Sequence, residues 1–192
     1  MKKHLIITTI IFSLSMLTQA QNLIKNGDFE NWKNTASNPA SWQPNNNAQT
    51  AAFECTNDKT RGNTLHLKEL ESSAPKARRF QNTTNIDISS AGTYKVSFKV
   101  KGNVGLRAVV LARKGENPST KDQSAINHTA SIKSYPSGTM IDEWTEVSTQ
   151  IVVSETATFA NDYRLHISWS HHSASAPACD FYIDDVKLEK IK

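Results

Sequence analysis

Four acidic side chains at the two extremities of this sequence have the chemistry of a metal site. Asp28 and Glu30 follow a Gly turn near the beginning, and Asp184 and Asp185 lie close to the end. If the first and last strands pair antiparallel, the four carboxylates converge and repel one another strongly unless a cation lies among them. Ca²⁺ takes six to eight oxygen ligands, some of which backbone carbonyls at a Gly turn supply. The alternative is that these acids form turns and solvated edge charges.

Basic and hydrogen-bonding side chains form a second candidate site, for sugars. Arg107 lies in an apolar segment, and Arg164 and His166 alternate with the apolar residues along 163–169. A third segment carries Lys95, Ser97 and Lys99 opposite its apolar residues, and Ser168 follows His166 on the same face. If these strands lie side by side, their polar faces form one basic surface that suits acidic or heavily hydroxylated sugars. The alternative is an ordinary solvated sheet face.

Sugar recognition also needs flat aromatic side chains that face solvent. Trp32 and Tyr135 lie outside the regular alternation and are the better candidates for such platforms. Two or more exposed aromatic side chains along a groove would favour a sugar ligand, and a broad apolar patch would favour a protein partner. The remaining aromatic residues in the strand-like segments are expected in the core: Trp42, Tyr94, Phe98, Trp144, Tyr163 and Trp169.

Sequence motifs of catalysis are absent. There is no Gly-x-Ser-x-Gly elbow and no Gly-rich phosphate loop. His166, His171 and His172 lack the spacing and the third partner of a zinc site. Glycoside hydrolysis needs two carboxylates on opposite sides of a cleft, and the pattern places no such pair. We therefore expect a protein that is not an enzyme, with a small hydrolase as a further alternative.

The first twenty residues have the pattern of a secretory signal peptide. A basic start precedes an apolar run, and small residues end at Ala20. The run is shorter than the roughly 20 residues that span a bilayer, so no membrane span is expected. Cleavage near Ala20 would leave a single domain over 21–192 that is secreted, periplasmic or on the cell surface. Loss of Lys2 and Lys3 lowers the formal net charge from +4 to +2, which argues against a nucleic-acid partner.

The chain contains two cysteines, Cys55 and Cys179. Outside the cytoplasm, such a pair is most simply interpreted as a disulfide, and this is the prediction we make. Two separate buried thiols are the alternative.

β-Strands must position all of these residues. Apolar and polar residues alternate with period two in several segments, including 94–100, 163–169 and 181–188, and no window shows a sustained helical stripe. Gly, Asn and Pro punctuate the intervals between these segments. Many short alternating strands separated by turns predict an all-β sandwich or barrel.

Three segments resemble a known group of proteins. The stretches NLIKNGDFENW (22–32), ASWQP (40–44) and FYIDDVKLEK (181–190) are together similar to carbohydrate-binding module families four, nine and twenty-two. The order and spacing of segments extend the resemblance over essentially all of 22–190. It implies a jelly-roll β-sandwich of the galactose-binding-domain type.

The resemblance also implies a structural Ca²⁺ that joins the two ends of the domain. Glu30 and Asp184 would supply side chains and Asp28 its main-chain carbonyl, with Asp185 the weaker candidate. Non-catalytic carbohydrate binding is the implied function. A cell-surface or extracellular module that binds a protein or an envelope component on the same fold is the alternative. The aromatic pair that sandwiches a glucan chain cannot be assigned here, so the glycan class stays open.

Overall fold

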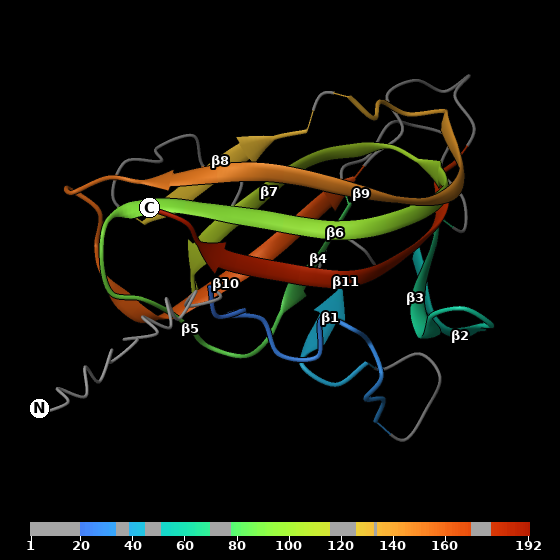
Figure 1. Ribbon diagram of the computed structural model, residues 1–192, viewed down its shortest axis with the longest axis horizontal. Helices are drawn as coiled ribbons and strands as arrows, with labels where there is room; N and C mark the ends of the chain where they lie inside the picture. Colours follow the sequence, from blue (N-terminus) through green and yellow to red (C-terminus); the bar gives the residue numbers. More distant parts are fainter. Residues whose placement is uncertain are drawn as a thin grey trace, which may run out of the picture.

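A computed structural model describes residues 20–33, 39–44, 51–69, 78–115, 126–132, 134–169 and 178–192. Over these residues the protein consists of two antiparallel sheets packed face to face (Figure 1). Among them no helix is long and apolar enough to cross a membrane. The predicted signal peptide lies outside the described residues, apart from Ala20.

The two sheets have different members and a jelly-roll order. The six-stranded sheet runs β1 (Trp42–Pro44), β4 (Arg78–Asn82), β10 (Ala160–Trp169), β7 (Leu106–Arg113) and β8 (Asn127–Ser131), with β5 (Ile86–Ile88) beside β10. The five-stranded sheet runs β2 (Ala51–Asp58), β3 (Gly62–Glu69), β11 (Asp180–Lys190), β6 (Gly92–Val104) and β9 (Thr139–Val153). The predicted jelly-roll β-sandwich is therefore confirmed.

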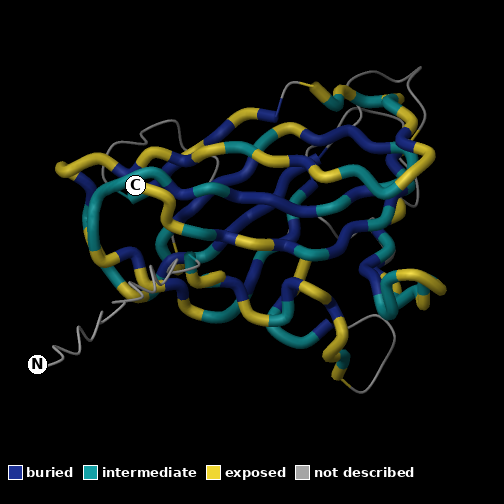
Figure 2. Tube along the Cα trace, viewed as in Figure 1, coloured by how far each residue is buried: buried dark blue, intermediate teal, exposed yellow. Residues whose placement is uncertain are grey.

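The core lies between the two sheets, and the period-two alternation directs every second side chain of a strand into it. Along β10 the residues Tyr163, Leu165 and Ile167 are fully buried, while Arg164 between them is not. Buried segments run along the middle of both sheets, and exposed ones cap the turns (Figure 2). The aromatic residues predicted in the core alongside Tyr163 are confirmed there, with the exception of Trp144: Trp42, Tyr94, Phe98 and Trp169.

Trp42 anchors the opening loop to this core. Its ring is 2% exposed and packs against Phe29 and Phe80, with centroids 5.5 and 5.2 Å away. Its indole nitrogen donates a hydrogen bond to the carbonyl of Asn26 at 2.8 Å. Asn26 has a φ of 51°, a left-handed conformation that Asn tolerates better than most residues. The Asn-Gly turn of the opening stretch is thus held from beneath by a buried tryptophan.

The two extremities of the domain lie side by side, as the sequence predicted. The amide of Leu23 donates to the carbonyl of Leu188 at 2.8 Å, and the amide of Val186 donates to that of Gly27 at 2.8 Å. A Cβ added at Gly27 would lie 2.0 Å from the Val186 oxygen, so this approach requires glycine. The opening segment therefore lies against β11 near both chain ends of the sandwich.

The predicted disulfide is wrong, because Cys55 and Cys179 both carry thiols. The strand register gives the reason. Cys55 on β2 pairs with Leu65, which pairs with Ile183 on β11. Cys179 precedes Ile183 by four residues, about 13 Å along the strand, and β2 lies two strand spacings of about 4.8 Å away. A disulfide needs Cα atoms about 4.4–6.8 Å apart, so this register cannot place the two sulfurs together.

Candidate functional site

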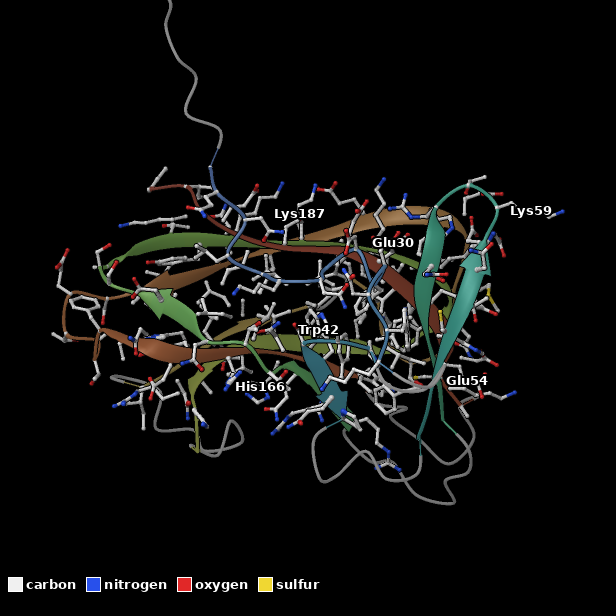
Figure 3. The ribbon with its side chains drawn as sticks, turned by 90° about the horizontal axis from the view of Figure 1, so that it is seen from below. Glu30, Trp42, Glu54, Lys59, His166 and Lys187 are labelled. Atoms are coloured by element: carbon white, nitrogen blue, oxygen red, sulfur yellow. The ribbon has the colours of Figure 1, made fainter. Side chains whose placement is uncertain are left out.

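The terminal acids gather around the turn between β2 and β3. A carboxylate oxygen of Glu30 accepts a hydrogen bond from the amide of Asn63 at 3.0 Å, and Figure 3 shows Glu30 beside this hairpin. The guanidinium of Arg61 donates from Nε to Asp184 at 2.5 Å and from Nη2 to Asp185. The hairpin tip thus links an acid from the opening segment to two acids from the last strand.

The cation between Asp184 and Asp185 is supplied by the chain itself, as Arg61. Asp28 lines a cavity of about 250 Å³ together with Asp185, beside the opening segment. Yet among the described residues no three His, Cys, Asp or Glu side chains are close enough together to hold a metal ion. In this arrangement the side chains do not fit a cage of six to eight oxygens. The calcium site stays a prediction.

Asp184 is the most buried of these acids, since its side chain is only 3% exposed. Burial raises the pKa of Asp184, and hydrogen bonds from the Asp185 amide at 2.7 Å and from Arg61 counteract this effect. A buried carboxylate is costly unless it is paired. Arg61 therefore stabilises the charged form of Asp184 and, with it, the contact between hairpin and last strand.

A second cluster lies on the outer face of the six-stranded sheet. Arg164 and His166 alternate on β10 with the buried residues, and His166 lies between Gln81 on β4 and Val110 on β7. Figure 3 shows His166 on the outer side of the six-stranded sheet, facing away from the five-stranded sheet. The register places Gln81 beside His166 and Arg79 beside Ser168, and the charge of the exposed Arg107 acts on Arg79. We call this surface the basic face: Arg79, Gln81, Arg107, Arg164, His166 and Ser168. The prediction that Lys95, Ser97 and Lys99 join this surface is wrong, because β6 belongs to the other sheet.

His166 is uncharged at neutral pH. Its side chain is 3% exposed, and burial followed by the charges of Arg79 and Arg164 lowers its pKa to about 4. The neutral ring has one donor and one acceptor nitrogen. Nearby Arg113 is already neutralised by Asp162, through two hydrogen bonds of 3.0 Å. Among the described residues Arg107 and Arg164 have no such carboxylate partner within 4.0 Å.

Two buried polar atoms on this face lack partners. Neither Nδ1 of His166 nor Nη1 of Arg164 has a hydrogen bond to any described residue. A buried polar atom without a partner costs about 1–3 kcal/mol, and most native structures avoid it. The structure therefore places two of the predicted binding residues on one face of β10, each with an unsatisfied buried atom.

The two predicted aromatic platforms lie elsewhere. Trp32 is half-buried against the core, and its indole nitrogen donates to the carbonyl of Phe29. Tyr135 is also half-buried and lines a cavity of about 290 Å³ with Glu146 and Ser148, between the edge strands β8 and β9. Neither ring is part of the basic face.

Sequence reasoning missed two aromatic side chains that line a pocket on the five-stranded sheet. Trp144 was expected in the core but is half-buried on the outer face, and Tyr182 shares its pocket. The signal was present in the alternation. Trp144 has the opposite parity to the buried Val147 and Ile151. Tyr182 likewise follows the buried Phe181. Applied strictly, the period-two alternation therefore places both rings on the outer face of the sheet, away from the core.

Comparison with solved structures shows a shared fold at low identity. The chain is similar to an arabinose-bound α-L-arabinofuranosidase (TM-score 0.56, 15% identity), covering 88% of this chain and 26% of that one. It is similar to the family 11 carbohydrate-binding module of a cellulosomal cellulase of Clostridium thermocellum (TM-score 0.51, 13% identity), covering 90% and 95%. A structure with the CBM22-1 and GH10 modules of a Clostridium thermocellum endo-1,4-β-D-xylanase has a TM-score of 0.51 at 14% identity, covering 91% and 29%.

The family comparison is more specific. No curated protein matches the chain. The family model described as "Carbohydrate binding domain", which groups carbohydrate-binding module families four and nine, matches residues 21–170. The terminal motifs, the jelly-roll order of the strands and this match agree. The protein belongs to the carbohydrate-binding domain family.

Proposed function

We propose that this protein is an exported, non-catalytic carbohydrate-binding module that holds its glycan on the basic face. One observation carries the proposal: Nδ1 of His166 and Nη1 of Arg164 are buried, belong to residues two apart on the same face of β10, and have no hydrogen-bond partners among the described residues. A small movement of these side chains would open both atoms to a sugar hydroxyl or carboxylate, which could then satisfy them. Each atom has already lost its water in the unliganded protein, at a cost of about 1–3 kcal/mol. A ligand that supplies the missing hydrogen bonds therefore has no further desolvation of these atoms to overcome.

The charge of the face favours an acidic glycan. Neither Arg107 nor Arg164 forms an ion pair within 4.0 Å with a described carboxylate, although the charge of Asp162 acts on Arg164. The pKa of Arg79 is lowered by burial and then by Arg107, which marks a concentration of positive charge. A guanidinium group binds a carboxylate through two parallel hydrogen bonds. The neutral ring of His166 adds a donor and an acceptor for hydroxyl groups. We therefore assign a glycan that contains uronic acid.

Similar structures support a carbohydrate ligand in general, since one is bound to arabinose and another is complexed with xylohexaose. Both of these sugars are neutral, so the acidic class rests on the charge of the basic face alone. The absence of catalysis rests on the family being a binding domain and on the cavities. Glycoside hydrolysis needs two carboxylates around the scissile bond. The cavity beside Tyr135 contains Glu146 as its acid, and the pocket beside Trp144 contains Asp58. Asp28 and Asp185 share the cavity beside the opening segment, but there Asp185 is paired with Arg61. Export rests on the leader pattern of residues 1–20.

The protein-interaction alternative has less in its favour. Met140 and Val152 are the two most exposed large apolar side chains among the described residues, at 62% and 69%. They lie near opposite ends of β9 and so do not form one apolar patch. Single exposed apolar side chains are ordinary on protein surfaces.

The test compares an acidic glycan with its neutral form. Binding of an oligogalacturonate and of its methyl ester is measured by calorimetry, after a glycan array has identified the best uronate. We expect a dissociation constant on the order of 10–1000 μM for the acid and about tenfold weaker binding of the ester. Arg164→Gln should weaken acid binding about tenfold. Lys95→Gln, on the other sheet, is the matched control. Equal binding of both variants, or no binding of any acidic or neutral glycan, would refute the proposal.

A further inference from the structure

We infer that the five-stranded sheet carries a second sugar-binding pocket, for a single neutral sugar ring, beside Trp144 and Tyr182. The pocket has a volume of about 280 Å³ and is lined by these rings and by the polar side chains of Thr56, Asn57, Asp58 and Lys101. It lies on the sheet opposite to the basic face, so the two sites are independent.

A bent hairpin forms one wall of this pocket. Asp58 and Trp144 belong to β2 and β9, the two edge strands of the five-stranded sheet, and four strand spacings of about 4.8 Å would separate them in a flat sheet. Yet the indole nitrogen of Trp144 donates to Asp58 at 3.2 Å. The end of the β2–β3 hairpin must therefore bend over the outer face, and Figure 3 shows the hairpin crossed relative to the long strands. Tyr182 and Lys101, which pair across β11 and β6, lie beneath it.

Both rings are held in place before any ligand arrives. The guanidinium carbon of Arg61 lies 5.2 Å from the centroid of the Trp144 ring. His66 stacks on Tyr182 with centroids 4.4 Å apart and an interplanar angle of 14°. His66 is in turn hydrogen-bonded to Asp180 at 2.6 Å. Neither Arg61 nor His66 lines the pocket. Each ring is thus supported on one side and borders the pocket on another, so little conformational entropy is lost on binding.

The polar groups provide both acceptors and donors at fixed positions. Hydrogen bonds from the hydroxyl and then the amide of Thr60 lower the pKa of Asp58 to about 2, so its carboxylate accepts hydrogen bonds from sugar hydroxyls at any ordinary pH. Lys101 has no ion pair or side-chain hydrogen bond with the residues that the structure describes, so its ammonium group can donate. Asn57 offers an amide that does both.

The balance of charge and size identifies the ligand class. Asp58 and Lys101 give the pocket one negative and one positive group, in contrast to the basic face. Pockets for drug-sized ligands measure about 300–1,000 Å³, so a smaller pocket fits one sugar ring better than a buried chain. Aromatic rings contact the apolar faces of a sugar, and the surrounding polar groups bind its equatorial hydroxyls. These features together favour a neutral hexose or pentose at the end of a glycan.

NMR spectroscopy of the full-length mature chain tests this pocket. The indole N–H signal of Trp144 is assigned with a Trp144→Phe variant and followed while methyl β-glucopyranoside, methyl β-galactopyranoside and methyl β-xylopyranoside are added. At least one should shift this signal, with a dissociation constant in the millimolar range. Tyr182→Ala should weaken that binding about tenfold and Asn57→Ala about threefold. Arg164→Gln, on the basic face, is the control and should leave it unchanged.

Two results would overturn the inference. One is an unmoved Trp144 signal with all three glycosides at concentrations on the order of 100 mM. The other is an equal response in wild type, Tyr182→Ala and Asn57→Ala, which would place the sugar elsewhere. Asn57 is exposed, so its variant folds even where a ring substitution does not. Binding of the oligogalacturonate is read separately, so failure of the basic face and failure of this pocket are distinguishable.

Discussion

Protonation of His166 should destabilise the folded protein as the pH falls below neutrality. Burial, then Arg79 and Arg164, lower the pKa of this histidine to about 4, from an ordinary value of 6.5. Between these two pH values the unfolded chain binds a proton that the folded protein does not bind. The free energy of unfolding therefore decreases as the pH falls through this window, and the contribution of neutral His166 is fully present only above pH 6.5.

The size of the effect follows from the two pKa values. Their difference corresponds to about 3 kcal/mol over the whole window, of which about 2 kcal/mol is lost by pH 5. The side chain is 3% exposed, so solvent screening reduces this figure little. A loss of this size is a substantial part of the roughly 5–15 kcal/mol that stabilises an ordinary domain.

Urea unfolding at about pH 7.5 and about pH 5 measures the effect in wild type and in His166→Gln. Glutamine does not titrate, so the variant should lose about 2 kcal/mol less than wild type between the two pH values. Any constant cost of the substitution cancels in this difference. Thr129→Ser, on an exposed residue of the same sheet, should keep the wild-type dependence. An identical pH dependence in wild type and His166→Gln would refute the assignment of a buried, neutral imidazole.

Two further predictions concern the ends of the chain and the cysteines. Arg61→Met leaves Asp184 buried without its cation, so urea unfolding should show a loss of about 3 kcal/mol, which Asp184→Asn in the same variant partly restores. EDTA tests the predicted calcium site: a fall in the melting temperature that added Ca²⁺ reverses would establish the site, and an unchanged melting temperature would remove it. A thiol assay on unfolded, unreduced protein should detect both Cys55 and Cys179, and a reading near zero would contradict the register of β2 and β11.

Much of the fold could be predicted because its signals are local. Alternation along 94–100 and 163–169 is a property of neighbouring residues, and it places Phe98 and Trp169 in the core without knowledge of partners. The terminal motifs likewise predicted that the opening segment lies against the last strand, and the Leu23–Leu188 hydrogen bond confirms it.

The sequence by itself thus determined that the chain forms strands, which face of most strands is buried, and that its ends meet. Tertiary structure alone decided the rest. The register of β2 and β11 separates the cysteines, and the bend of the β2–β3 hairpin brings Arg61 to Asp184 and Asp58 to Trp144. These contacts join residues far apart along the chain. Their geometry depends on strand order, bulges and sheet curvature, which no local pattern of residue types encodes.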